Sequence, residues 1–209
     1  MIVVIDYGMG NLRSVSKALE TLGASVCVSS RPDDVVKAEK VILPGVGAFG
    51  AAMRELNARH LVEPIQQVIQ QGTPYLGICL GLQLLFEYGE EGEGAAGLGV
   101  LKGRVKRFDT NGSLKIPHIG WNQIIVNQKS KIKDQRECPV LKGVPDQSFV
   151  YFVHSYYADP ADRSVVAAET EYGARFTSML WRDKLFATQF HPEKSQAIGL
   201  KLLENFIQL

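Results

Sequence analysis

The segment PYLGICLGLQLLFE, residues 74–87, joins a strand-like apolar run to a helix-like run through a turn that holds Gly77, Cys79 and Gly81. The spacing is G-x-C-x-G, and small residues on both sides of a cysteine relieve crowding where the backbone bends sharply. A thiol on such a bend is expected to be exposed and directed, and a helix amino terminus there favours its thiolate form. The segment therefore predicts a nucleophile, and the alternative interpretation is an ordinary buried cysteine.

The alternation of apolar runs and helical patterns in the first ninety residues predicts the fold class. Apolar runs lie at 2–6, 25–30, 40–45 and 73–79, and helical patterns lie at 11–23, 50–71 and 80–89. This order is that of β-α-β units, so we predict a parallel sheet with helices on both faces. The Gly- and Glu-rich stretch 87–99 is interpreted as a mobile loop without a core of its own.

The pattern changes after residue 98. Short strands with turn residues between them are predicted at 99–108, 118–126, 148–158, 164–173 and 175–190. This half is expected to be mainly antiparallel, and an amphipathic helix over 194–209 closes the chain. No repeat or linker separates the halves. The sequence therefore predicts one α/β domain over residues 1–209, with a mixed, largely parallel central sheet and antiparallel strands in its C-terminal half.

Composition and charge exclude several functions. The chain has 209 residues, of which 45% are hydrophobic and 22% charged, as is typical of a globular protein with a real core. Its 23 basic and 22 acidic residues leave a net charge of +1. Neither nucleic acid nor a membrane is therefore expected as a partner. Three scattered cysteines and the lack of a leader pattern predict reduced thiols in a cytoplasm, with Cys27 in the core and Cys138 in a loop.

A nucleophilic thiol needs a base, and His191 has the most informative context of the four histidines. It stands in FATQFHPEKS before a proline, which holds the preceding residue extended, and in an extended chain residues two apart point to the same side. His191 and Glu193 are therefore expected to be neighbours, with the carboxylate fixing the imidazole tautomer. Alone, HPE is interpreted as a turn, but beside Cys79 it predicts a Cys-His-Glu triad. The other histidines receive no catalytic role: His60, expected at the surface, His118 and His154.

A glycine-rich turn, VILPGVGAFG at residues 41–50, follows a predicted strand. Acyl chemistry on a thiol needs donors for an oxyanion, and two backbone N–H groups suffice. One would be that of Leu80, and the other that of Val46 or Gly47. The stretch lacks the Gly-Lys-Ser/Thr ending of a phosphate-binding loop. The alternative is a plain tight loop between strand and helix.

Together, PGVGAFG, GICLGLQ and HPEKS resemble the class I, or triad-type, glutamine amidotransferases. Members of this family hydrolyse glutamine to glutamate and pass the ammonia to a partner synthase. The resemblance implies a flavodoxin-like fold and no cofactor, and the sequence shows no metal-ligand spacing. Further motifs, DYGMGNLRSV, PHIGWNQ and FVHSYYA, resemble the branch that serves imidazole glycerol phosphate synthesis in the histidine pathway. Leu82 and Val46 stand where relatives of anthranilate or guanylate synthesis usually carry histidine and proline.

The resemblance implies a role for each matching residue. Cys79 would be the nucleophile, His191 the general base and then acid, and Glu193 the orienting carboxylate. The oxyanion donors would be the backbone groups of Val46, Gly47 and Leu80. The amino-acid end of L-glutamine would be held by Gly45, Gln83, Ser155 and Tyr156. In the family the oxyanion turn is often misaligned until the partner binds, so the isolated chain is expected to be nearly silent.

The implied partner is a (β/α)8-barrel cyclase, which forms a heterodimer with this chain and uses the ammonia to make imidazole glycerol phosphate. Its docking face would hold Asn11, Trp121, Tyr151 and Lys194. Trp121 could equally be ordinary strand core. Three alternatives stay open: a glutaminase subunit for the anthranilate, guanylate or pyridoxal phosphate pathway, an amidase or peptidase acting alone, and a non-catalytic binding module. The sequence assigns no role to residues 126–139.

Overall fold

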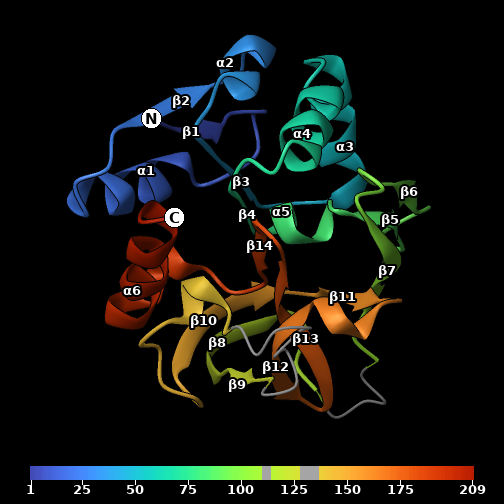
Figure 1. Ribbon diagram of the computed structural model, residues 1–209. Helices are drawn as coiled ribbons and strands as arrows, with labels where there is room; N and C mark the ends of the chain where they lie inside the picture. The colour runs from blue at the N-terminus through green and yellow to red at the C-terminus, as the bar shows by residue number, and fades with distance from the viewer. Residues whose placement is uncertain (110–113, 128–136) are drawn as a thin grey trace.

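The computed structural model describes residues 1–109, 114–127 and 137–209 (Figure 1). The stretch 126–139, to which the sequence assigned no role, lies mostly outside these residues. Within these residues, a 12-stranded sheet runs in the order β2-β1-β3-β4-β14-β13-β11-β7-β5-β6. Strand β12 pairs with β13, and β9 pairs with β12. No helix among the described residues has the length and apolar character needed to cross a bilayer.

The N-terminal part of the sheet is parallel. Its strands are β1 (Ile2–Ile5), β2 (Val26–Ser29), β3 (Lys40–Gly45) and β4 (Tyr75–Cys79). The helices between them are α1 (Leu12–Thr21), α2 (Pro32–Val36), α3 (Phe49–Ala58) and α4 (Val62–Gln70). All four strands pair in parallel, and β14 (Leu185–Thr188) adds a fifth parallel strand beside β4. The predicted parallel sheet is confirmed.

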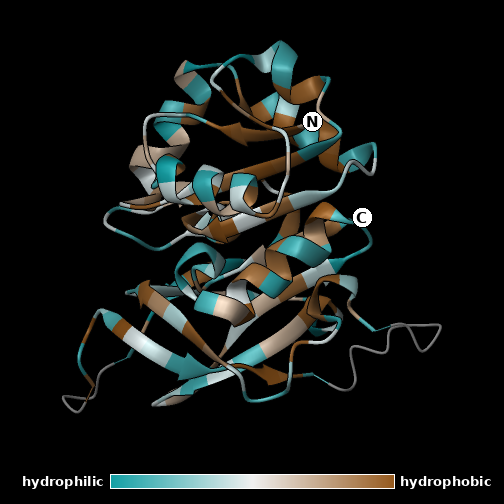
Figure 2. Cartoon of the chain, turned by 90° about the vertical axis from the view of Figure 1, so that its left-hand side faces the viewer, coloured by the Kyte–Doolittle hydropathy of each residue, from teal (hydrophilic) through white to brown (hydrophobic). Residues whose placement is uncertain are grey.

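Alternate side chains of the parallel strands enter two separate cores. Val3 and Ile5 pack with residues of α2, α3 and α4, whereas Ile2 and Val4 pack with α1 and the C-terminal helix α6 (Gln196–Ile207). Successive strand residues point to opposite faces, so helices must cover both. Figure 2 shows the hydrophobic residues gathered on the strands and the hydrophilic ones on outer helix faces.

The C-terminal half is mainly antiparallel. Its strands, with the two that precede them, are β5 (Phe86–Gly89), β6 (Ala95–Ala96), β7 (Leu101–Arg107), β8 (His118–Gln123), β9 (Ile125–Val126), β10 (Phe149–His154), β11 (Tyr156–Pro160), β12 (Val166–Tyr172) and β13 (Ala174–Arg182). Short 3₁₀ turns occupy Pro139–Leu141, Arg163–Val165 and Pro192–Lys194. Strands β8 and β10 form a separate two-stranded antiparallel ribbon. The predicted mixed α/β class is confirmed.

The helix expected over residues 80–89 is wrong beyond its first turn. Helix α5 (Leu80–Gln83) ends after four residues, and β5 begins at Phe86. The carbonyls that would continue the helix bind elsewhere, since those of Leu84 and Leu85 accept hydrogen bonds from the N–H groups of Leu98 and Val100. An apolar run that is buried on every side has no helical period to specify its length.

Three smaller expectations also need correction. The single helical stretch over 50–71 is two helices, broken near His60, which is exposed as expected and has a φ of 56°. The stretch 87–99 is no coreless loop, because Leu98 is buried in the main core and strand β6 lies within it. Cys138 is a core residue, only 4% exposed. Cys27 is partly buried and packs against the core.

The bend at the end of β4 is built by close packing of its two glycines. A Cβ on Gly81 would lie 1.9 Å from the carbonyl oxygen of Leu43, and one on Gly77 would lie 2.6 Å from the carbonyl oxygen of Gly81. The left-handed conformation falls on Cys79 itself, with φ at 56°. Neighbouring backbone is therefore too close for a side chain at either glycine, and the strained backbone conformation falls on Cys79.

Replacing Gly81 by alanine is expected to lower the free energy of unfolding by about 2 kcal/mol or more, because the new methyl group overlaps the backbone of β3. Urea unfolding followed by circular dichroism measures the change. Gly50→Ala is the matched control, since a Cβ there meets only ordinary contacts at 3.5 Å and longer. Equal stability of the Gly81 variant and the wild type would contradict the packing described for the bend.

Candidate active site

Cys79 ends β4 and faces a cavity of about 400 Å³. The expectation of an exposed thiol is wrong, because the residue is only 6% exposed. The cavity brings together most of the residues expected to handle an oxyanion or substrate: Val46, Gly47, Leu80, Gln83, Ser155 and Tyr156. Gly45 is buried behind them and is the register partner of Cys79 in β3.

His191 and Glu193 lie beside one another just after β14. His191 is extended, with φ at −98° and ψ at 98°, and Pro192 begins a 3₁₀ turn. Its Nδ1 lies 2.8 Å from Oε1 of Glu193, and the two side chains are 2% and 1% exposed. A carboxylate accepts, so Nδ1 carries the proton and donates it. The other ring nitrogen, Nε2, is thereby left to exchange protons.

The electrostatics of this cluster favour an imidazolium. Burial alone would lower the pKa of His191, but its interaction with Cys79 and its hydrogen bond to the Glu193 carboxylate raise it to about 10. Nε2 is buried and has no partner at ordinary hydrogen-bond geometry. The interaction of His191 with the sulfur is therefore electrostatic. Helix α5 has only four residues, so the imidazolium is a stronger support for a thiolate than the helix dipole.

Gln83 and Gln189 connect the sulfur to the backbone of β11. Nε2 of Gln83 donates to the carbonyl oxygen of Tyr156 at 2.9 Å and to Oε1 of Gln189 at 3.1 Å. Nε2 of Gln189 in turn donates to Sγ of Cys79 at 3.7 Å. With both amide hydrogens of Gln83 engaged, its Oε1 is the atom left to accept a further hydrogen bond.

Gln189 was missed by the sequence reasoning, although a signal was present. It stands two positions before His191, just as Glu193 stands two positions after. The alternation rule that pairs His191 with Glu193 also places residue 189 on the same side of the chain. Gln189 is fully buried, with an exposure of 0%.

Two buried histidines, His118 and His154, also lie at this site. Nδ1 of His154 is 2.8 Å from the carbonyl oxygen of Tyr156, which can only accept, so His154 donates there. Its Nε2 then accepts from Nδ1 of His118 at 3.1 Å, and Asn122 lies 3.3 Å from the remaining nitrogen. Burial lowers the pKa of His118 to about 4 and that of His154 to about 3. Both are therefore neutral near pH 7.

The residues expected at a docking face come from different elements of the fold. Trp121 is 45% exposed, so its alternative interpretation as core is wrong. Its ring meets that of Tyr151 edge-on at 6.0 Å, and Nζ of Lys194 lies 5.9 Å from the centre of the Tyr151 ring. Asn11 caps α1, a helix that contacts the Pro192–Lys194 turn.

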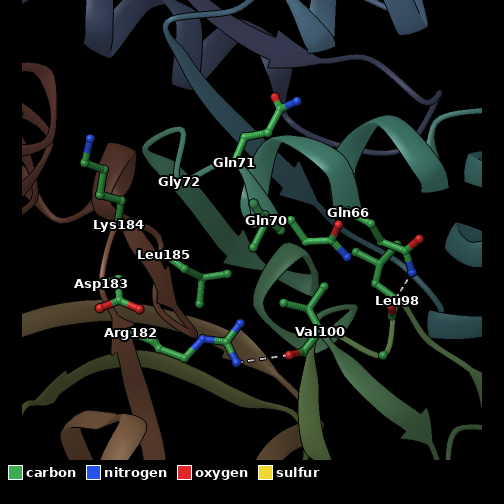
Figure 3. A pocket seen from close by; sticks show the side chains of 12 residues that line it. Gln66, Gln70, Gln71, Gly72, Leu98, Val100, Arg182, Asp183, Lys184 and Leu185 are labelled. Atoms are coloured by element: carbon green, nitrogen blue, oxygen red, sulfur yellow. Dashed lines mark hydrogen bonds between the residues drawn. The ribbon is translucent and has the colours of Figure 1, made fainter.

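A larger cavity, of about 780 Å³, lies at the opposite ends of the same strands (Figure 3). Leu185, the first residue of β14, lines it together with Gln66 and Arg182, whereas Cys79 is the last residue of β4. Figure 3 shows Gln66 and Arg182 hydrogen-bonded to the carbonyls of Leu98 and Val100. The residues that line it include no cysteine, serine, threonine or histidine. Among the described residues, no group of metal-ligating side chains gathers anywhere.

The buried histidine pair predicts acid sensitivity. An unfolded histidine has a pKa near 6.5, and the folded values of His118 and His154 are lower, so the unfolded state binds more protons between about pH 6.5 and 3. The stabilising effect of the pair is full above pH 6.5 and is lost as the pH falls. Urea unfolding from pH 7 to 4 is expected to show a shallower loss in His118→Gln than in the wild type. His60→Gln, at the surface, is the control and should leave the slope unchanged; an identical slope in His118→Gln would contradict the assignment.

Comparisons with known proteins identify the family. The family model of glutamine amidotransferase class-I matches residues 3–209. Imidazole glycerol phosphate synthase subunit HisH of Syntrophotalea carbinolica is 51% identical over 99% of this chain and 98% of its own length. The protein of the same name from Thermosynechococcus vestitus is 51% identical over 100% and 96%.

Solved structures share the fold at low identity. A crystal structure of a glutamine amidotransferase covers 100% of both chains with a TM-score of 0.74 and 17% identity. PurLQS from Thermotoga maritima matches with a TM-score of 0.70 and 19% identity, over 99% of this chain and 95% of that one. With a family model that spans almost every residue and full-length relatives near half identity, this chain belongs to the class I glutamine amidotransferases.

Proposed function

We propose that this chain is the glutaminase subunit of an imidazole glycerol phosphate synthase. It hydrolyses L-glutamine to glutamate and ammonia, and the ammonia passes to a (β/α)8-barrel cyclase in a heterodimer. The observation that carries the proposal is the 51% identity, over nearly the full length, to subunits of that name. The proposal places the enzyme in the cytoplasm, where a catalytic thiol stays reduced.

The first half-reaction makes a thioester. The Cys79 thiolate attacks the side-chain amide carbon of glutamine, and the negative oxygen that develops is held by the N–H groups of Leu80 and of Val46 or Gly47. The tetrahedral intermediate then collapses, its C–N bond breaks, and His191 delivers the Nε2 proton to the departing nitrogen. Ammonia leaves, and glutamyl remains on the sulfur.

The second half-reaction restores the enzyme. His191, now neutral, takes a proton from water as that water attacks the thioester carbon. The C–S bond breaks, glutamate leaves, and the thiolate and the imidazolium are regenerated together. Glu193 holds Nδ1–H throughout, so that the same nitrogen faces the substrate in both halves. The high pKa of His191 suits a resting ion pair.

Substrate orientation would come from the cavity wall opposite the turn. Oε1 of Gln83 accepts from the α-ammonium group of glutamine, and backbone groups of Ser155 and Tyr156 hold the α-carboxylate. Both residues line the cavity beside Cys79, at the junction of β10 and β11. A substrate bound this way directs its side-chain amide toward the sulfur.

The partner would dock on the outer face of the β8–β10 ribbon. Ile119, Trp121 and Phe149 are 59%, 45% and 55% exposed, and they share this face with Tyr151. Such a cluster of exposed apolar side chains is typical of a protein interface. Ammonia released into water would largely become ammonium, which is not nucleophilic, so a docked partner must receive it directly.

A glutaminase subunit for another synthase would have the same triad but a different partner. The names of the full-length relatives favour the histidine pathway. A free-standing amidase or peptidase would need no partner. Glutamine hydrolysis measured with and without the barrel cyclase and its nucleotide substrate distinguishes these functions. Full activity of the isolated chain would contradict gating by a partner, and ammonia release that ignores the nucleotide would contradict coupling.

Replacement of the nucleophile tests the chemistry. Cys79→Ala in the complex with the cyclase is expected to lower glutaminase kcat about a thousandfold or more, because no thioester can form. Synthesis from added ammonium salts should persist, since the cyclase does not need the triad. Cys138→Ala, which removes a core thiol distant in function, is the control for loss of sulfur as such. Retention of glutaminase activity in Cys79→Ala would overturn the triad assignment.

Truncation of the exposed tryptophan tests the docking face. Trp121→Ala is expected to raise the dissociation constant of the cyclase complex about thirtyfold, as a central interface aromatic is worth about 2 kcal/mol. Calorimetric titration measures it. Tyr88→Ala on β5 is the matched control, since Tyr88 is 43% exposed and outside the ribbon. If both variants bind like the wild type, the partner docks elsewhere.

A further inference from the structure

We propose that Gln189 is a positioning residue for the nucleophile. Its side-chain N–H holds the sulfur of Cys79, and a hydrogen-bonded chain that starts at the backbone carbonyl of Tyr156 fixes which end of its amide faces that sulfur. The inference deepens the proposed function, on which it rests only for the role of Cys79. Four contacts among buried groups carry it.

The chain starts at an atom that cannot change its role. The carbonyl oxygen of Tyr156 only accepts, and it lies 2.9 Å from Nε2 of Gln83 and 2.8 Å from Nδ1 of His154. The amide of Gln83 must therefore present nitrogen, not oxygen, on this side. The neutral state of His154, whose pKa burial lowers to about 3, keeps its single proton on the same contact.

The orientation passes from Gln83 to Gln189. The second N–H of Gln83 meets Gln189 at 3.1 Å, so that Gln189 must offer its oxygen there. Its nitrogen then faces Sγ of Cys79, at 3.7 Å. Rotating the Gln189 amide by half a turn would put nitrogen against nitrogen and oxygen against sulfur. Gln83 is 6% exposed and Gln189 0%, so water is poorly placed to compensate for either loss.

A fixed donor at this position acts on the charged form of the sulfur. Hydrogen bonds to ionised groups are stronger than neutral ones, so the N–H of Gln189 favours the thiolate at rest and when it leaves the thioester. Other groups also act on the sulfur. His191, backed by Glu193, supplies positive charge. Burial raises the pKa of the Tyr7 hydroxyl, and the nearby Cys79 raises it further. The remaining titratable groups on the cavity wall are His154 from β10, Tyr156 from β11, and Glu91 between β5 and β6.

The test is the pH profile of alkylation at Cys79. Iodoacetamide reacts with thiolate without any need for glutamine or the cyclase, and mass spectrometry of the peptide that contains Cys79 separates it from the other cysteines. Gln189→Met keeps the length and removes the donor. Gln189→Glu keeps an acceptor for Gln83 and places a carboxylate against the sulfur.

Both variants are expected to move the half-maximal pH of alkylation upward, Gln189→Glu further than Gln189→Met. At pH 7 Gln189→Met should react about tenfold more slowly than the wild type and Gln189→Glu more slowly still, while the limiting rate at high pH stays the same. Gln66→Met is the matched control, because Nε2 of Gln66 donates to the carbonyl of Leu98 at 2.7 Å beside the far cavity. An unshifted profile in both Gln189 variants, or an equal shift in Gln66→Met, would overturn the proposal.

A second measurement needs no variant at position 189. Alkylation of the native protein removes the charge from the sulfur, so the side-chain N–H resonances of Gln189 should move upfield in a ¹H–¹⁵N spectrum. Unchanged resonances would overturn the contact. These readouts are separate from glutaminase activity. If the shifts are observed but no ammonia is released with the cyclase, the positioning role of Gln189 stands and the proposed glutaminase function is wrong.

Discussion

The organisation of this site depends on a left-handed backbone at Cys79, held between two glycines that touch neighbouring main chain. Such a conformation costs of order 1–3 kcal/mol in a residue with a side chain, so the surrounding packing must compensate. One constraint on the bend comes from β3, whose Leu43 carbonyl leaves no room for a side chain at Gly81. The bend ends β4 with the sulfur in the cavity, so the chemistry follows from a packing constraint.

The second requirement of the site is met by the sheet order. β14 is the last strand in sequence, yet it lies directly beside β4, and the two run parallel. The carboxyl ends of adjacent parallel strands meet at one edge of a sheet, which is where ligands bind in α/β folds. Cys79 and His191, separated by most of the chain, are therefore brought to the same edge. The antiparallel half supplies the facing wall through β10 and β11.

The sequence predicted those features that depend on local geometry. The G-x-C-x-G spacing predicted the bend at Cys79, and the proline after His191 predicted an extended backbone that pairs His191 with Glu193. The length of α5 was not predictable, because the acceptors of Leu84 and Leu85 are taken by residues that only the tertiary fold brings near. The same holds for His118 and His154, whose tautomers depend on a carbonyl in another strand. The burial of Cys79 was not predicted, because the spacing of residues in G-x-C-x-G does not show which side chains cover the bend.

The β8–β10 ribbon is a single layer, and its alternate residues face opposite sides. Ile119 and Trp121 project outward, whereas His118 and His154 point into the molecule. Alternation along each strand keeps the exposed and the buried side chains of the ribbon on opposite faces. The exposed residues can therefore be substituted without disturbing the buried ones. The exposed side chains and the buried histidines are thus free to change independently along the same few residues of chain.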